Sequence, residues 1–294
     1  MSKYYILDVF AEQKYSGNQL AVVRDGHKYA DDEMQKIARE FNFSETTFIL
    51  SETERDGGYD VRIFTPAQEL PFAGHPTLGT AYIIQQEIIS QEVERVTLNL
   101  KAGPIPVEFS YRDGEVRELV MKQLQPEFGK QVEPAEVAAM LQIDPSDVDE
   151  RFPCLEASTG MYDLIVPLRT LDAQKRVTID LPKYYELIEN LTAKAILTFC
   201  PETYNANLQL NVRMFADYFG VPEDPATGSA NGCLAGYLVK EGYFESDTID
   251  IRTEQGLQIG RPSVLHLMAE KTTKGIDIRV GGKVVRFAEG KLAQ

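Results

Sequence analysis

The feature that most constrains the fold of this 294-residue chain is an internal repeat. Three landmarks recur in the same order: Arg62-Ile63-Phe64 as Arg213-Met214-Phe215, His75-Pro76 as Asp224-Pro225, and the helical residue Ile37 as Leu187. Their offsets are 151 (213 − 62), 149 (224 − 75) and 150 (187 − 37). A near-constant offset at three places indicates a duplication. The sequence therefore predicts two similar domains that face each other, with the cleft between them as a natural ligand site.

Each half of the chain mixes helix-like and strand-like segments. A helix capped by Asp31 or Asp32 is expected from the helical spacing of its apolar residues, which are Met34, Ile37, Ala38 and Phe41. The segment 77–84 is apolar on every side, which is typical of a buried helix. Further helices are expected at 134–141, 184–191 and 227–238. Strands are expected at 4–10, 19–24, 46–50, 61–64, 95–100, 105–110, 117–123, 162–166, 195–199 and 211–215.

Charge and composition exclude several classes of function. The formal net charge is −15, and a surface this acidic repels nucleic-acid phosphates, although a pocket can still be locally positive through backbone N–H groups. The chain has no run of about 18 apolar residues, and its first residues lack a secretion-signal pattern. We therefore expect a cytoplasmic protein that binds neither nucleic acid nor membranes.

Motifs for metals and cofactors are missing from the sequence. The three cysteines, Cys154, Cys200 and Cys233, are far apart, which argues against a disulfide framework or a zinc site. No phosphate loop of the Gly-x-x-x-x-Gly-Lys type and no dinucleotide fingerprint occurs. The sequence therefore indicates neither a zinc site nor a nucleotide cofactor.

Two turns rich in small residues, at 73–77 and 223–229, each open an apolar helix. Small residues let the backbone approach a ligand closely, and the free N–H groups of a helix start attract anions. Two such starts at matched places in a repeat favour the binding of a substrate carboxylate. The alternative for either turn is plain capping with tight helix packing.

Ser44-Glu45 precedes the apolar run Phe48-Ile49-Leu50. A glutamate at a strand edge is usually solvated. The matching place in the second half, near Ala195, carries no acid, however, and an acid in only one of two repeated domains suits a single-base proton shuttle. Burial would raise the pKa of this carboxyl toward working pH, so that Glu45 could take a proton and return it.

Six segments, in order along nearly the whole chain, resemble the signature segments of the PhzF-like family of isomerases from phenazine biosynthesis. They are Gly17 to Val23, Ser44-Glu45-Thr46, Arg62 to Pro66, Glu69 to Gly79 (ELPFAGHPTLG), Glu223 to Ala230 (EDPATGSA) and Gly260 to Ser263. The resemblance implies an α/β fold of the diaminopimelate-epimerase type, with two pseudo-symmetric domains, each an antiparallel barrel-like sheet around a central helix. It also implies a homodimer and a last strand that packs on the first domain. The expected domains are 1–122 with the tail 283–294, and 123–282.

The resemblance also implies a mechanism. The glutamate of the Ser-Glu-Thr motif, here Glu45, shuttles a proton between two carbons of a carboxylated cyclohexadiene in the phenazine enzyme. The residues expected to bind and orient the substrate are Asn18, Ser44, Gly74, His75, Asp224, Gly228 and Ser229. Two alternatives stay open at this stage. His75 is either a second acid/base or a structural hydrogen-bonding histidine, and Asp224 is either catalytic or a helix N-cap.

Diaminopimelate epimerases, which share the implied fold, use one cysteine from each domain as opposed bases. Neither turn of this chain contains cysteine, so a one-base isomerase fits better than a two-thiol racemase. The first hypothesis is therefore a cofactor-independent isomerase acting on a small carboxylated metabolite. The second is a catalytically silent relative that binds a small molecule or another protein. The sequence does not name the substrate, and it leaves open whether the pathway is phenazine synthesis.

Overall fold

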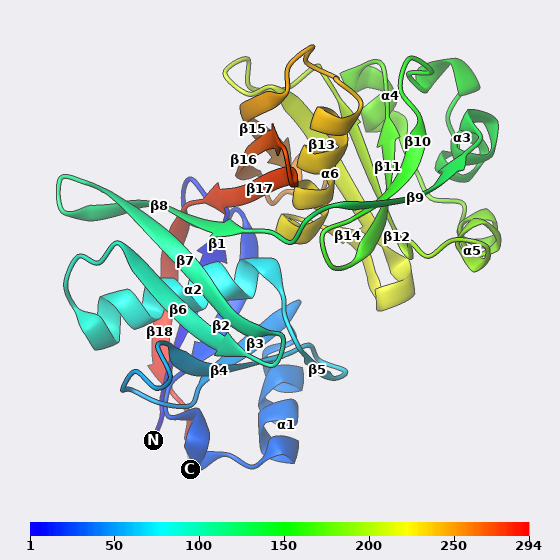
Figure 1. Cartoon of the computed structure of the whole chain (residues 1–294). Helices are drawn as coiled ribbons and strands as arrows, with labels where there is room; N and C mark the ends of the chain where they lie inside the picture. Colours follow the sequence, from blue (N-terminus) through cyan, green and yellow to red (C-terminus); the bar gives the residue numbers. More distant parts are fainter. Residues whose placement is uncertain (294) are drawn as a thin grey trace. The chain divides into compact units, whose positions relative to one another are not determined.

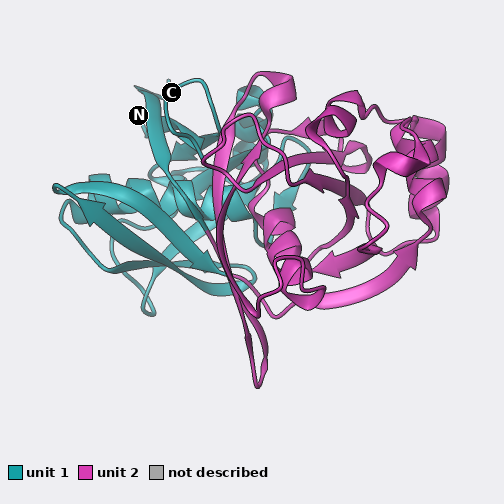
Figure 2. Cartoon of the chain, turned by 90° about the horizontal axis from the view of Figure 1, so that it is seen from above, with its two compact units in different colours: residues 1–122, 281–294 teal, residues 123–280 magenta. Residues whose placement is uncertain are grey.

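The computed structural model describes residues 1–293 and divides the chain into two compact units. Unit 1 comprises Met1–Lys122 together with the C-terminal segment from Gly281, and unit 2 comprises Gln123–Val280 (Figure 2). Unit 1 is closed by the last strand, β18, which pairs antiparallel with the first strand, β1. The first and last strands of the chain therefore lie side by side in unit 1 (Figure 1).

Unit 1 is a mixed sheet that wraps a central helix. Its strands run in the order β8, β7, β6, β4, β3, β2, β1, β18. The pairs β2–β3 and β4–β6 are parallel, and the others in this order are antiparallel. The strands are β1 (Lys3–Val9), β2 (Asn18–Val23), β3 (Glu45–Ile49), β4 (Tyr59–Phe64), β5 (Glu69–Leu70), β6 (Arg95–Leu100), β7 (Gly103–Arg112), β8 (Glu115–Lys122) and β18 (Val284–Lys291). The helices are α1 (Asp31–Phe41) and α2 (Gly74–Ile84), and α2 continues into a π-helical turn at Gln85–Ile89.

Unit 2 repeats this plan. Its strands run in the order β9, β10, β11, β12, β13, β15, β16, with β11–β12 and β13–β15 parallel. The strands are β9 (Glu127–Val132), β10 (Cys154–Ser158), β11 (Tyr162–Pro167), β12 (Ala195–Cys200), β13 (Leu210–Ala216), β14 (Val221–Asp224), β15 (Thr248–Gln255), β16 (Ser263–Thr272) and β17 (Gly275–Gly282). The helices are α3 (Pro134–Leu141), α4 (Leu171–Arg176), α5 (Leu181–Glu189) and α6 (Gly228–Lys240). Helix α5 matches α1, and helix α6 matches α2.

The expected fold class is confirmed, and the structure corrects three details of it. Each sheet is mixed rather than wholly antiparallel, because α1 and α5 are crossovers between parallel strands. Helix α1 begins at Asp31 with Ala30 as its N-cap, so neither expected aspartate caps it; Asp31 instead binds Arg62. The His75-Pro76 landmark does not match Asp224-Pro225, since Pro76 lies inside α2 whereas Pro225 precedes α6.

The central helix of unit 1 is buried on every side, as its composition predicts. All residues of α2 except Tyr82 are buried, and the helix packs against β1, β2, β3, β6, β7, β8 and β18. Gly79 permits the close approach to β2, since a Cβ atom built on it would lie 2.5 Å from Leu20 Cδ2. Thr47 of β3 and Thr80 of α2 share a hydrogen bond of 2.7 Å. These contacts fix the position of the helix start relative to β2 and β3.

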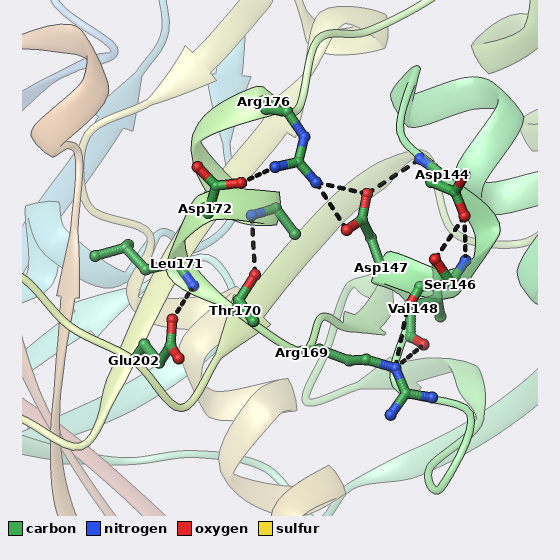
Figure 3. Close-up of polar contacts among 11 residues, drawn as sticks. Asp144, Ser146, Asp147, Val148, Arg169, Thr170, Leu171, Asp172, Arg176 and Glu202 are labelled. Carbon is green, nitrogen blue, oxygen red and sulfur yellow. Dashed lines mark hydrogen bonds and ion pairs between the residues drawn. The ribbon is translucent and has the colours of Figure 1, made fainter.

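In unit 2, polar contacts hold the short helix α4 in place (Figure 3). Thr170 caps α4 by accepting a hydrogen bond from the Ala173 N–H. Arg176 at its end donates to both carboxylate oxygens of Asp147, at 2.7 and 2.8 Å. The backbone N–H of Leu171 donates to Glu202 at 2.8 Å. Helix α4 is thereby anchored to the segments before β10 and after β12.

The tight contact at Gly79 yields a stability prediction. Gly79→Ala is expected to lower the free energy of unfolding by about 1–2 kcal/mol, because overpacking against Leu20 outweighs the better helix propensity of alanine. Leu20→Ala alone is expected to cost about 2–5 kcal/mol through the cavity that it leaves. The double variant should then cost less than the sum, since the new Cβ occupies space that Leu20 has vacated. Urea unfolding of all four proteins measures this, and strictly additive losses would contradict the contact.

Candidate active site

In unit 1 the chemistry gathers where β2 and β3 begin and α2 starts. Glu45 is the first residue of β3, and its Cα lies opposite Leu20 of the parallel strand β2. Asn18, the first residue of β2, is buried, and Ser44 directly precedes Glu45. Gly74 and His75 are the first two residues of α2. The structure thus brings together all five residues that the sequence placed in this half of the site.

Glu45 and His75 lie beside each other. His75 Nε2 lies 3.4 Å from Glu45 Oε2 and 3.3 Å from the carbonyl oxygen of Gln19. The side chain of Glu45 is 16% exposed and that of His75 is 7% exposed, so the pair is shielded while the carboxylate keeps some access to solvent. The Gln19 carbonyl oxygen and Glu45 Oε2 are both acceptors, so an N–H on Nε2 can donate to either of them.

Burial keeps His75 neutral. It lowers the pKa of the imidazole to about 3, against a weaker opposing effect of the hydrogen bond to the Gln19 carbonyl. At neutral pH the ring therefore carries one proton, and the acceptors at Gln19 and Glu45 favour the Nε2–H tautomer. Of the two roles left open by the sequence, the hydrogen-bonding one fits this geometry, because an imidazole with so low a pKa is a poor general acid at neutral pH.

In unit 2 the second helix start is held by an amide network. Gln255 Nε2 donates to the Asp224 carbonyl at 2.8 Å and to Thr227 Oγ1 at 3.1 Å. Asn231 Nδ2 donates to the Thr227 carbonyl at 3.0 Å and to Gln255 Oε1 at 2.9 Å. The Thr227 hydroxyl donates to the Asp224 carboxylate. Sequence reasoning missed Gln255 and Asn231, since only the pairing of β13 with β15 brings Gln255 to this turn.

The structure decides what caps α6. Thr227 occupies the N-cap position, and Asp224 lies three residues earlier at the end of β14. The N-cap alternative for Asp224 is therefore wrong. Gly228 and Ser229 are the first two residues of α6, as Gly74 and His75 are of α2. Neither Ala73 nor Thr227 caps its helix with a side chain, which leaves the first-turn N–H groups of both helices without that partner.

Matched arginine–glutamate pairs hold the segments that lead into the two helices. In unit 1, Arg62 donates to both carboxylate oxygens of Glu69, each at 2.7 Å. In unit 2, Arg213 does the same to Glu223, at 2.9 and 2.8 Å. Each arginine also lies over the ring of the phenylalanine two residues on, at 5.0 Å for Phe64 and 4.8 Å for Phe215. A bidentate pair fixes orientation as well as distance, so β5 and β14 enter their turns with a set geometry.

The Arg62–Glu69 pair also changes the pKa of its carboxyl group. The Arg62 guanidinium holds the pKa of the Glu69 carboxyl below its usual range, although partial burial acts in the opposite direction. Glu69 therefore stays ionised at neutral pH, and its ion pair with Arg62 persists. In unit 2, Arg213 also donates to the carbonyls of Gln174 and Val177, each at 2.9 Å, which ties the pair to the end of α4.

Other residues singled out in the sequence lie away from these two helix starts. His27 is exposed and contacts the Leu50 carbonyl at 3.1 Å. His266, for which the sequence suggested no partner, pairs with Asp250 at 2.7 Å. Within residues 1–293, no cluster of three or more His, Cys, Asp or Glu side chains has the arrangement of a metal site. None of the helices in that range has both the length and the apolar character needed to cross a membrane.

Comparison with known proteins places this chain and its architecture in one family. The family model described as phenazine biosynthesis-like protein matches residues 7–290. The chain is 34% identical over 292 residues to trans-2,3-dihydro-3-hydroxyanthranilate isomerase of Pseudomonas aeruginosa, covering 99% of both sequences. It is also 34% identical over 300 residues to an uncharacterized isomerase of Mesorhizobium japonicum, covering 98% of both. A crystal structure of a PhzF-family phenazine biosynthesis protein from Bacillus anthracis superposes with a TM-score of 0.91 at 27% identity, covering 100% of this chain and 99% of that one.

The chain therefore belongs to the PhzF-like, phenazine biosynthesis-like family. Within that family, it is an isomerase.

The buried histidine gives a prediction for acid stability. Because the folded-state pKa of His75 lies below its ordinary value of 6.5, the unfolded chain binds one more proton at this residue as pH falls from about 6.5 to 3. The contribution of neutral His75 to stability is thus present above that window and is lost within it. His75→Gln, which keeps an N–H near the same place, is expected to lose less stability than the wild type between about pH 7 and pH 4.5.

Urea unfolding at both pH values measures this difference, with His27→Gln as the control for loss of an exposed histidine. Equal losses in wild type and His75→Gln would show that the imidazole is not held neutral by burial.

Proposed function

We propose that this protein is a cofactor-independent isomerase that moves a proton between two carbons of a small carboxylated substrate, with Glu45 as the single acid/base. The observation that carries the proposal is the pairing of Glu45 with the neutral imidazole of His75, 3.4 Å away, at the start of the buried helix α2. The matching position in unit 2 holds Ala195, so the repeat supplies one carboxylate and not two.

The chemistry needs only one carboxyl group. The Glu45 carboxylate takes a proton from a carbon of the substrate, and the electron pair of the broken C–H bond moves into the conjugated system. The carboxylic acid that results, whose proton can exchange with solvent because the Glu45 side chain is partly exposed, then delivers a proton to a second carbon, which restores the carboxylate. We assign to the Nε2–H of His75, which lies 3.4 Å from Glu45 Oε2, the orientation of the Glu45 carboxylate.

We assign to the two helix starts the binding of anionic substrate groups. The first-turn N–H groups of α2 and α6 lack a side-chain cap, and the helix dipole favours a negative charge there. Gly74 and Gly228 allow close approach of a ligand, and Ser229 adds a hydroxyl. Asn18, Ser44 and Asp224 are proposed to contact other substituents of the substrate. The sequence leads us to expect a cleft between the two domains, and also a homodimer. Both stay predictions.

The names of two relatives supply a first substrate to try. Trans-2,3-dihydro-3-hydroxyanthranilate carries a carboxylate and a cyclohexadiene ring, and the related enzymes of two Pseudomonas species are named as its isomerases. We also propose a cytoplasmic location.

The proton transfer is tested by isotope exchange. Glu45→Gln is expected to lower the rate of substrate isomerisation, and of deuterium incorporation from heavy water, by about 100- to 10,000-fold, the usual contribution of a positioned acid/base. Glu45→Asp, which retracts the carboxyl group by one methylene, is expected to retain intermediate activity. Nuclear magnetic resonance of trans-2,3-dihydro-3-hydroxyanthranilate in heavy water measures both reactions.

Glu40→Gln is the matched control, because Glu40 is an exposed glutamate on α1 only five residues before Glu45 (45 − 40). It should behave as the wild type. Full activity in a folded Glu45→Gln protein would refute the mechanism. Tight binding of the substrate without turnover in the wild type would favour the second hypothesis, a small-molecule-binding relative without catalysis.

A further inference from the structure

A carboxyl group that the proposed mechanism does not use lies in the core of unit 2. Asp163 is the second residue of β11, and its Cα lies opposite Ala157 of β10 and Ala195 of β12. The residue is only 1% exposed. Its side chain adjoins Cys233 on helix α6, which packs against β11. Asp163 is therefore enclosed between the sheet and the central helix.

The surroundings of Asp163 do not satisfy a charged carboxylate. Within the part of the chain that the structure describes, neither of its side-chain oxygens makes a hydrogen bond of normal geometry. An isolated buried carboxylate is so costly that the group takes up a proton instead. Burial accordingly raises the pKa of Asp163 to about 7, while the Cys233 thiol lowers it. Asp163 thus changes its charge near neutral pH.

The internal repeat fills the matching place in unit 1 without an acid. The residue of unit 1 that matches Asp163 is Leu20, because each lies opposite the first residue of the next parallel strand, Ala195 or Glu45. The residue that matches Cys233 is Gly79, because each is the sixth residue of its central helix. Unit 1 therefore fills this place with an apolar leucine and a glycine, whereas unit 2 has a carboxyl and a thiol.

The polar cluster reaches the start of α6. The Thr159 hydroxyl contacts Cys233 Sγ at 3.7 Å and donates to the Ser229 carbonyl at 3.4 Å. Cys233 Sγ also lies 3.6 Å from the Met161 carbonyl. Since Cys233 follows Ser229 by four residues, Asp163 lies about one helical turn, roughly 5.4 Å along the axis, below the first N–H groups of α6. A charge on Asp163 is thus close to the proposed anion-binding position.

Few other charges act on Asp163. From β12 the facing residue is Ala195, from β10 it is Ala157, and from α6 it is Cys233, whose own pKa is raised well above its ordinary value by burial first and by Asp163 second. The nearby Glu156 carboxylate belongs to the other face of the sheet, where it accepts hydrogen bonds from the N–H groups of Lys130 at 2.9 Å and Ala193 at 2.7 Å. Asp163 is therefore the group that changes its charge in this cluster at neutral pH.

We propose that protonated Asp163 is a positioning residue for the anion-binding start of helix α6, so that an anion binds there with uptake of a proton. This inference rests on the proposed function, which assigns an anionic substrate group to that helix start. When Asp163 is neutral, the helix dipole and the N–H groups act on the anion without opposition from Asp163. When Asp163 is ionised, its negative charge opposes the anion through a poorly screened interior. By linkage, a bound anion in turn raises the affinity of Asp163 for its proton.

Binding of the carboxylate probe anthranilate, measured by calorimetry, tests the proposal. Two unit charges about 10 Å apart at an effective dielectric constant of about 20 change a dissociation constant on the order of tenfold. The Kd of wild-type protein is expected to rise about tenfold between pH 6 and pH 8.5. Asp163→Asn, which has the same shape and no titrating proton, should bind with nearly the same Kd at both pH values.

The double variant Asp163→Leu/Cys233→Gly is the second test, because it rebuilds in unit 2 the Leu20 and Gly79 arrangement of unit 1. It should also bind anthranilate without dependence on pH in this range. An equal pH dependence in wild type and Asp163→Asn would overturn the inference and leave the proposed function intact. A failure of anthranilate to bind wild-type protein at either pH would overturn the inference together with the anion-binding role of α6, while the isotope-exchange test of Glu45 would still judge the proton transfer.

Stability gives an outcome that does not depend on any ligand. Because the folded-state pKa of Asp163 lies above its ordinary value of 3.8, its contribution to stability is complete below that value and is lost as pH rises to about 7. Relative to wild type, Asp163→Asn should therefore become progressively more stable as pH rises through this window, as measured by urea unfolding. A constant difference between the two proteins across the window would show that Asp163 does not hold a proton in the folded state.

Discussion

The burial of one helix inside each sheet is the constraint on which the rest of this structure depends. Helix α2 is enclosed by strands of unit 1, and α6 packs against β10, β11, β15 and β16 of unit 2. A helix that is buried on all sides needs small residues where strands come close, and Gly79 supplies this against Leu20. Its first-turn N–H groups, however, must find partners at the helix start. At the starts of α2 and α6, the first-turn N–H groups lack a side-chain cap. The signature turns of the sequence lie at both helix starts.

Rigid support for those turns comes from polar groups rather than from caps. The bidentate Arg62–Glu69 and Arg213–Glu223 pairs fix the strands that enter the turns, and the amides of Gln255 and Asn231 fix the turn of unit 2. A catalytic geometry that tolerates only small displacements requires such support. The two units differ in what they place beside this common frame. Unit 1 has a carboxylate at the start of β3 and a neutral imidazole at the start of α2, whereas unit 2 has a protonatable acid buried below its helix start.

The sequence predicted much of the architecture for a clear physical reason. Short apolar runs bounded by turn residues marked strands such as β6 and helices such as α3, whose observed bounds, Arg95–Leu100 and Pro134–Leu141, agree with the expected ones. Strands with weak patterns, including β9 and β14, were not predicted, because each alternates little and owes its form to its neighbour in the sheet. Likewise the direction of pairing between β2 and β3 depends on the crossover through α1, which no local pattern encodes.

What the sequence alone determined was the duplication, the two apolar helices with their small-residue turns, and a glutamate present in only one half. These follow from residue type and spacing, which local physics and the family resemblance can interpret. Only the tertiary structure decided that Glu45 lies against His75, that burial holds this imidazole neutral, and that Asp224 is not the cap of α6. It alone revealed Gln255 at the second turn and Asp163 beneath it, because burial and contact between distant segments arise only when the strands pair and the helix is enclosed.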